Sequence, residues 1–216
     1  MKAYIITFLL VVSGNLFSQR FYYNNYSEIV EGKQLERIDE QYFEGNFSSA
    51  LISSDETETV YKLRYNAYFD EIEYEDNGKR YYLAKTIDET VYFRELNKKY
   101  VCMNYTYDGE NKTGFLVEIF VGDKYSVYKR EKIEYFIGHK ADEVKTTGSQ
   151  QYKKLKDVYF IEMNENLVPI PNSKKKFSSM FGEKESEVFE YLKENKISLN
   201  DLMDLRQLFR HLNEME

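Results

Sequence analysis

The sequence has little of the chemistry that metal sites and many catalytic sites use. It contains one cysteine, Cys102, and two histidines, His139 and His211. A transition-metal site needs several such ligands at fixed spacing, so we expect no metal and no cofactor. A single cysteine also excludes an internal disulfide bond, and the core must be stable without one. Cys102 lies in an alternating stretch and is interpreted as a small buried apolar residue.

Motifs of the common catalytic classes are absent from the sequence as well. There is no glycine-rich phosphate loop, no Gly-x-Ser-x-Gly elbow and no His-Glu-x-x-His segment. Proline is scarce too, and the only two, Pro169 and Pro171, predict the end of the β region or an edge strand, because proline cannot donate to a sheet ladder. The sequence therefore assigns no catalytic, cofactor-binding or metal-binding residue.

The one long apolar run is too short to cross a bilayer. Lys2 precedes nine residues, Tyr4 to Val12, that are almost all apolar, and small and polar residues follow. A spanning helix needs roughly 20 apolar residues. This layout predicts a secretory signal peptide over residues 1–19, cleaved near Ser18 or Gln19. We expect a periplasmic or secreted protein without a lipid anchor, since no cysteine lies near this boundary.

Positive charge is in short supply. The chain has 30 lysine and arginine residues against 37 acidic ones, a net charge of −7. An acidic protein repels phosphate backbones, so no nucleic acid partner is expected. Glu71, Glu73 and Glu75 alternate on one predicted strand and could not face lipid, so we expect no integral membrane span after signal cleavage. The expected partner is an envelope protein or a glycan.

Tryptophan is absent, but tyrosine occurs 21 times. Tyrosine can form exposed aromatic platforms for sugars or peptides, because its ring is apolar and its tip is polar. It also suits half-buried strands. Other residues with AT-rich codons are abundant as well, so codon composition explains the many tyrosines better than an aromatic platform does.

Alternation with period two predicts an antiparallel β domain over residues 20–172. The segments at 60–65 and 71–75 alternate in this way, and Asn77-Gly78 predicts a tight hairpin turn after them. Residues 20–44 are weakly patterned, with a short helix expected around Gly32 to Gln41. An exposed loop is expected over residues 138–156. Further strands are predicted near residues 80–85, 90–95, 100–107, 115–121, 125–135, 157–163 and 167–171.

The period becomes helical over residues 173–216, which predicts a C-terminal helical unit packed on the β domain. Ser173 is expected to cap the first helix and Gly182 to end it. Ser198 and Asp201 resemble a capping box before the last helix. The predicted fold class is thus α+β and mostly β, an antiparallel meander (open barrel or sandwich) with two to three C-terminal helices.

The acidic clusters suggest sites, but their patterns are not specific. The cluster from Asp70 to Asp76 contains paired carboxylates such as glycosidases use, yet acids that alternate with apolar residues are also typical of a solvated strand face. Asp108, Glu110 and Asn111 are possible calcium ligands, but their spacing departs from an EF-hand loop and favours a hairpin turn. Lysines at 174–176 are interpreted as solvated surface.

Several segments resemble proteins of a known group. They are LRYNAYFDEIEY at 63–74, GDKYSVYKR at 122–130, and SKKKFSSMFG with KENKIS in the tail. Together with a signal ending in Phe-Ser-Gln, they resemble small secreted or periplasmic proteins of Bacteroidota, over about residues 45–214. That group has no established activity, so the resemblance implies a Gram-negative envelope or secreted setting and no site residues.

Two functional hypotheses from different classes remain. The first is an exported, non-enzymatic protein that binds another envelope component, since an export signal is present and no catalytic constellation is. The alternative is a small periplasmic carbohydrate- or lipid-related hydrolase that uses carboxylates. Exposed tyrosines beside converging acids in a concave pocket would favour the hydrolase, whereas buried tyrosines under a flat or convex acidic face would favour the binding protein.

Overall fold

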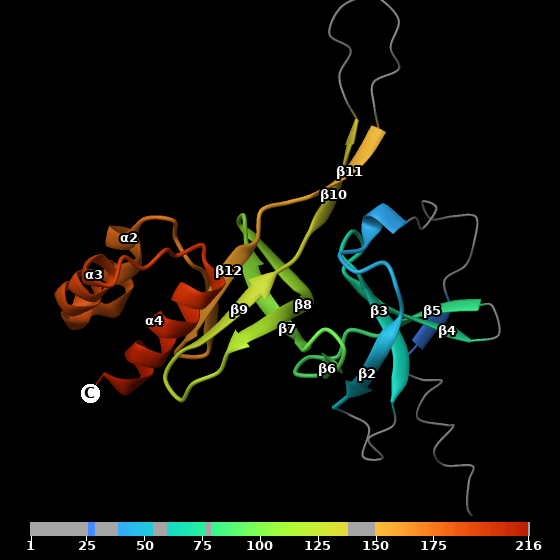
Figure 1. Ribbon diagram of the computed structural model, residues 1–216, viewed down its shortest axis with the longest axis horizontal. Helices are drawn as coiled ribbons and strands as arrows, with labels where there is room; N and C mark the ends of the chain where they lie inside the picture. Colours follow the sequence, from blue (N-terminus) through green and yellow to red (C-terminus); the bar gives the residue numbers. More distant parts are fainter. Residues whose placement is uncertain (1–25, 29–38, 54–59, 77–78, 138–149, 216) are drawn as a thin grey trace, which may run out of the picture.

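The computed structural model describes residues 26–28, 39–53, 60–76, 79–137 and 150–215 (Figure 1). The predicted signal peptide, the Asn77-Gly78 turn and His139 lie outside these ranges. Of the helix expected around Gly32 to Gln41, only Asp39–Gln41 is described, and it forms a 3-10 turn, η1. No helix within the described ranges combines the length and the apolar character that a membrane crossing requires.

The predicted fold class is confirmed, because an antiparallel sheet forms most of the molecule and helices follow it. Eleven strands pair in the order β1-β5-β4-β3-β2-β6-β7-β8-β9-β12-β13, and β10 with β11 forms a separate two-stranded ribbon. The strands are β1 (Tyr26–Glu28), β2 (Ser48–Ile52), β3 (Tyr61–Asn66), β4 (Glu71–Asp76), β5 (Lys79–Leu83), β6 (Thr90–Phe93), β7 (Lys98–Tyr107), β8 (Glu110–Phe120), β9 (Ser126–Arg130), β10 (Ile133–Ile137), β11 (Gln150–Lys154), β12 (Val158–Met163) and β13 (Asn166–Pro169).

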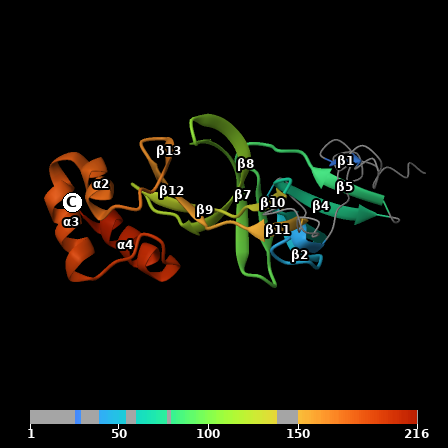
Figure 2. The same ribbon diagram turned by 90° about the horizontal axis from the view of Figure 1, so that it is seen from above.

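The long hairpin of β7 and β8 lies within the sheet, between β6 and β9. Its turn has positive φ angles at Asp108 (54°) and Gly109 (76°), as a two-residue hairpin turn requires, which confirms the hairpin predicted there. Beyond it, β8 and β9 change register between Glu118 and Phe120, an irregularity of the kind that bends a sheet. Strands β7, β8, β9, β12 and β13 of this sheet curl into a half-barrel, and Figure 2 shows β12 and β13 beside the arc of β7 and β8.

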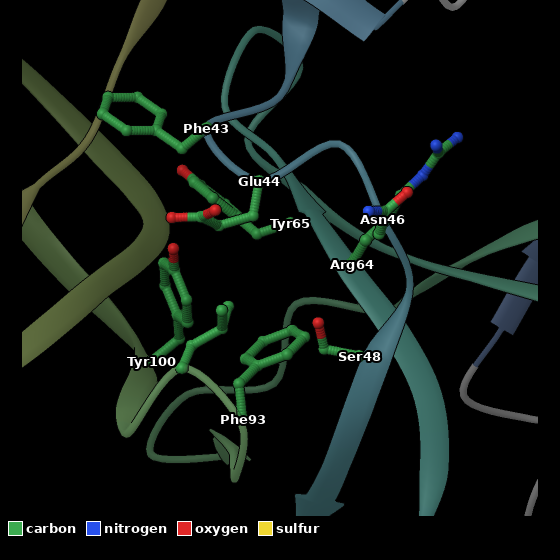
Figure 3. Close-up of a pocket in the computed structure, with 9 residues that line it drawn as sticks. Phe43, Glu44, Asn46, Ser48, Arg64, Tyr65, Phe93 and Tyr100 are labelled. Atoms are coloured by element: carbon green, nitrogen blue, oxygen red, sulfur yellow. The ribbon is translucent and has the colours of Figure 1, made fainter.

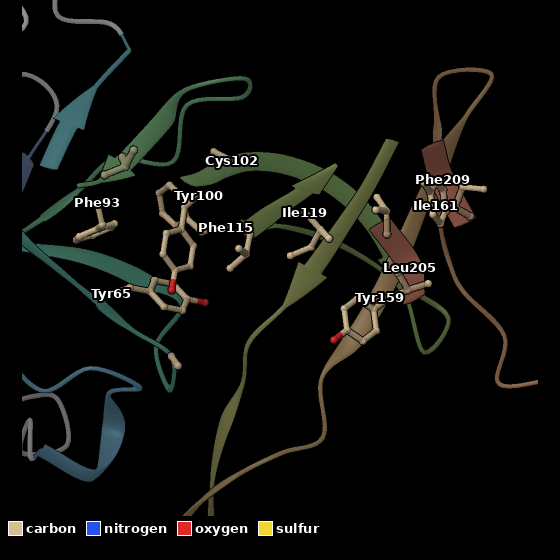
Figure 4. Close-up of a cluster of buried hydrophobic side chains, with 14 of the residues drawn as sticks. Tyr65, Phe93, Tyr100, Cys102, Phe115, Ile119, Tyr159, Ile161, Leu205 and Phe209 are labelled. Atoms are coloured by element: carbon tan, nitrogen blue, oxygen red, sulfur yellow. The ribbon is translucent and has the colours of Figure 1, made fainter. Parts of the chain in front are cut away.

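Apolar side chains cover both faces of β8, as the run FLVEIFV predicts. Phe115 and Val117 belong to the larger of two buried clusters, and Leu116 belongs to the smaller one inside the half-barrel. Figure 4 follows the larger cluster from Tyr65 across the sheet to the last helix. Cys102 is fully buried in this cluster, as expected for a small apolar residue.

The C-terminal helices pack on the sheet in two layers. They are α2 (Lys174–Ser178), a 3-10 segment η2 (Ser179–Lys184), α3 (Glu185–Glu194) and α4 (Leu202–Glu214). Helix α4 contacts β8 and β9, while Phe177 of α2 meets Phe209 of α4 with 6.4 Å between ring centroids. Ser173 caps α2 as predicted, but α4 is capped by Asp201 itself and not by Ser198. Asp204 instead accepts a hydrogen bond from the backbone N–H of Ser198.

Two boundaries differ from those predicted. The strand expected over residues 125–135 is interrupted at Glu131 and Lys132, where β9 ends and β10 leaves the main sheet. Part of the loop expected over residues 138–156 is strand β11, which pairs with β10 along its whole length. Pro169 ends the edge strand β13, as the proline pair predicted.

Candidate functional site

A buried ion pair joins β3 and β4. Glu73 is fully buried and Arg64 almost so, and the Arg64 Nε and Nη2 atoms each lie 3.0 Å from Glu73 Oε2. The guanidinium also lies over the rings of Tyr42 and Phe47, at 3.8 and 4.5 Å from the centroids. The prediction of a solvated acidic face is therefore wrong for Glu73, because its residue opposite in the sheet is Arg64.

Uncharged side chains complete this network. The Tyr42 hydroxyl donates to Glu73 and accepts a 2.8 Å hydrogen bond from Arg64. Asn66 donates to the other carboxylate oxygen at 3.0 Å and to the Gln41 side-chain oxygen. Burial, and after it the charge of Glu73, raise the pKa of Tyr42 well above its ordinary value, so the hydroxyl stays a donor. Such a satisfied network stabilises one arrangement of strands and leaves no carboxylate oxygen for chemistry.

A second buried carboxylate, Glu131, connects β7 to β9. Its side chain lies 3.1 Å from Lys98 Nζ and 2.8 Å from Lys129 Nζ. The Tyr100 hydroxyl donates to it at 2.7 Å. Tyr65 packs against Tyr100 with tilted rings, 4.6 Å between centroids. Since Lys98 and Tyr100 come from β7 and Lys129 from β9, this cluster holds the point where β10 leaves the sheet.

The pKa of Glu131 is lowered. Burial by itself would raise this pKa, but the nearby charges of Lys98 and Lys129 and the hydrogen bonds from Lys129 and Tyr100 outweigh it. A depressed carboxyl pKa stabilises the fold above the unfolded-state pKa of about 4.3, and that contribution is lost as the pH falls through the lower folded-state value. A general acid for glycoside hydrolysis needs the opposite shift.

Replacing Glu131 with glutamine is accordingly expected to lower the urea midpoint at pH 7 and to matter less in acid. The difference between wild type and variant should shrink as the pH falls from 5 towards 3, because the unfolded wild-type chain then takes up a proton at Glu131 that the folded protein binds less readily. Urea unfolding at a series of pH values, followed by circular dichroism, measures the difference. A wild-type advantage that stays constant down to pH 3 would contradict the assignment.

Asp70 occupies the turn between β3 and β4 and has a left-handed φ of 57°. It accepts hydrogen bonds from the Tyr65 hydroxyl at 2.8 Å and from the backbone N–H of Phe115 at 3.1 Å. Lys85 pairs with its other oxygen at 2.8 Å. A Cβ at Gly114 would come within 2.2 Å of that oxygen, so glycine permits the close approach. Asp70 therefore docks the turn on β8 and is not a free carboxylate.

A small pocket lies beside these clusters, lined by Phe43, Glu44, Asn46, Ser48, Arg64, Tyr65, Phe93, Leu96 and Tyr100. Figure 3 shows the Tyr65 and Tyr100 hydroxyls and the Glu44 carboxylate on one side of it, with Arg64 directed away. Tyrosines and acids thus converge, which was the arrangement that would favour a hydrolase. The free space, however, is about 10 Å³, enough for one water molecule at most, and both tyrosines are buried.

A larger hollow opens where the half-barrel fails to close. β6 pairs only with residues 98–101 of β7, and β13 approaches the remainder of β7 without any strand pairing or backbone hydrogen bond between them in the described chain. The resulting groove, which we call the seam groove, has a volume of about 470 Å³. It is lined by Asn104, Tyr105, Thr106, Asn111, Lys112, Thr113, Glu165, Asn166, Leu167 and Val168.

Paired asparagines and threonines form one wall of the seam groove. Asn104 lies opposite Thr113, and Thr106 lies opposite Asn111, in the register of the hairpin. Each threonine hydroxyl donates to the asparagine Oδ1 across from it, at 2.6 Å for Thr113 and 3.0 Å for Thr106. All four side chains are exposed. We call these two pairs the Asn–Thr rungs.

The structure shows where the residues singled out from the sequence lie and what they contact. Asp108 lies in the hairpin turn, and Glu110 begins β8 and pairs with Lys112. No group of acidic, cysteine or histidine side chains suited to a metal occurs among the residues the structure describes. His211 stacks on Tyr191, with 3.7 Å between centroids, far along the chain from Cys102. Lys174 bonds the backbone oxygen of Leu192, so this lysine has a structural partner.

Of the residues that line the seam groove, only Asn111 was singled out from the sequence, as a possible calcium ligand. The pairing of the Asn–Thr rungs follows from a hairpin centred on Asp108-Gly109, so hairpin register was a usable signal for them. The approach of β13 had none, because it depends on the curl of the sheet. Comparison of the chain with protein-family models, curated proteins and solved structures finds no match.

Proposed function

We propose that this is an exported, non-enzymatic protein that binds another component of the cell envelope through the seam groove. The export assignment rests on the pattern of residues 1–19 and on the resemblance to secreted or periplasmic proteins of Bacteroidota. The observation that carries the binding assignment is the groove itself, an open hollow of about 470 Å³ at an unpaired strand edge. Ligand sites are typically hollows of about 300–1,000 Å³.

The state of the buried acids supports binding over carboxylate catalysis. Glu73 is paired with the buried Arg64 and Glu131 with the partly buried Lys98 and Lys129, and each carboxylate accepts a hydrogen bond from a tyrosine hydroxyl. Asp70 is paired with Lys85 and bonded to the backbone of β8. Glu73 joins the neighbouring strands β3 and β4, Glu131 joins β7 to β9, and Asp70 docks its turn on β8, so all three have a structural role. The hydrolase alternative would require one of them to leave its partners and admit a substrate.

The proposal is tested by sedimentation of the purified, exported protein with washed envelope fragments of a Gram-negative bacterium. We expect the wild type to sediment with the fragments and the Asn104→Ala/Asn111→Ala double variant to remain mostly in solution. Asn172→Ala is the matched control, because Asn172 is equally exposed but lies outside the groove, before α2. It should sediment as the wild type does.

The opposite results are equally clear. Wild type that stays in solution, or a double variant that sediments as well as wild type, would overturn binding through the seam groove. Turnover of a glycoside or ester panel that is lost in Glu131→Gln would favour the hydrolase. Circular dichroism of both variants shows whether the fold is retained, and the exposed position of the two asparagines predicts that it is.

A further inference from the structure

We infer that the ligand of the seam groove is an uncharged, hydroxyl-rich chain, a neutral oligosaccharide. This inference rests on the proposed function, since it names the chemical class that the same groove takes. It follows from three properties of the groove: the donors on the Asn–Thr rungs, the balance of charge, and an apolar side chain of β13.

The Asn–Thr rungs present amide donors in fixed directions. Each threonine hydroxyl occupies the Oδ1 of its asparagine, which orients the amide so that its Nδ2 hydrogens are the groups left to bind a ligand. No described residue accepts a hydrogen bond from Nδ2 of Asn104 or Asn111. Sugar hydroxyls accept from amide donors and can donate to carbonyl and carboxylate oxygens. Two preoriented amides on neighbouring rungs suit successive hydroxyls on one ligand.

Charge in the groove is balanced. Among the described residues that line it, Lys112 is the only cation, and Lys112 is already paired with Glu110. Glu165 supplies one negative charge on the facing turn between β12 and β13. Recognition of phosphate, sulfate or uronate groups relies on clustered arginine or lysine side chains, and the chain as a whole carries a charge of −7. The groove therefore favours an uncharged ligand over an anionic one.

One apolar side chain of β13, Val168, lines the groove; it is half-buried and packs against the larger buried cluster. Tyr105 and Leu167 are buried in the small cluster inside the half-barrel, and Tyr105 faces away from the Asn–Thr rungs because successive side chains of a strand point to opposite faces. Tyr105 packs edge-on against Phe160, with 5.1 Å between centroids, which fixes the position of its ring. The C–H face of a sugar ring is apolar while its rim is polar, so Val168 can contact that face while the amides of the rungs bond the rim. A charged peptide would match the uncharged donors of the groove poorly.

Binding to an array of immobilised oligosaccharides tests the inference. The array carries neutral glucose, mannose and N-acetylhexosamine oligomers, uronate oligomers, and peptides of mixed sequence. We expect binding to at least one class of neutral oligomer, with affinity unchanged within twofold between 50 and 500 mM NaCl, because the contacts are uncharged. The Asn104→Ala/Asn111→Ala variant should bind the same oligomer at least about tenfold more weakly. Asn172→Ala should bind it as the wild type does.

Other outcomes overturn the inference in distinguishable ways. Binding only to uronate oligomers, with a steep loss in salt, would show that the groove selects anions. Binding only to peptides would point to pairing with the free edges of β7 and β13 instead. If no oligosaccharide binds while envelope fragments still retain the wild type and release the double variant, the ligand class is wrong and the proposed function stands. If envelope fragments retain nothing either, both fail.

Discussion

Replacing Arg64 with methionine is expected to destabilise the protein by about 3–5 kcal/mol, because the fully buried Glu73 then lacks its cation. Methionine keeps much of the volume between the rings of Tyr42 and Phe47, so the loss measures mainly the uncompensated charge. The free energy of unfolding in urea is the quantity to measure, with the slope of the transition checked to remain that of a single step.

Two companion variants make this result specific. Arg80→Met removes the same kind of side chain from an exposed pair with Glu75, in which both residues are more than 40% exposed, and should cost less than about 1 kcal/mol. The double variant Arg64→Met/Glu73→Leu removes both buried charges and should recover part of the stability lost in the single variant. If Arg64→Met costs no more than Arg80→Met, the ion pair does not hold β3 to β4 in the way described.

Truncating Phe209 to alanine is expected to cost about 3–5 kcal/mol, the range found for a fully buried phenylalanine. Phe209 lies on the face of α4 that packs inward, and it meets Phe177 of α2, so its loss opens a cavity between the helices and the sheet. Because α4 and β8 share one buried cluster, a single cooperative unfolding transition is expected to shift as a whole.

Met203→Ala is the matched control on the same helix. Met203 is 68% exposed, and alanine is at least as good a helix former, so stability should change by less than about 0.5 kcal/mol. An early, separate unfolding step of the helices in Phe209→Ala, with the sheet unchanged, would show that the C-terminal helical unit is energetically independent of the β domain.

Local pattern predicted most of the architecture. Alternation indicated the strands, the Asp108-Gly109 turn indicated the central hairpin, and the helical period began at the residue that caps α2. Strand β11 was missed because its sequence, QQYKK, is polar on both faces. Such a strand exists because β10 offers it a backbone partner, and no hydrophobic period records that pairing.

The break between β9 and β10 had a different cause. Alternation continues across Glu131 and Lys132, so the sequence reads as one strand. In the structure β9 ends at Arg130, and the Glu131 carboxylate lies in the interior, where it pairs with Lys98 and Lys129. Glu73 was misjudged for a related reason, since an acid that alternates with apolar residues looks solvated until the residue opposite it is known to be Arg64.

The sequence by itself thus determined the class of fold, the hairpins and the helical unit, together with the absence of known catalytic motifs. These features depend on residues that are close together in the chain, so they are visible as periodicity in the sequence. Only the tertiary structure decided that Glu73 and Glu131 are buried and neutralised, and that β13 meets β7 to form the seam groove. Both depend on contacts between residues far apart in the chain, which follow from the curl and register of the sheet.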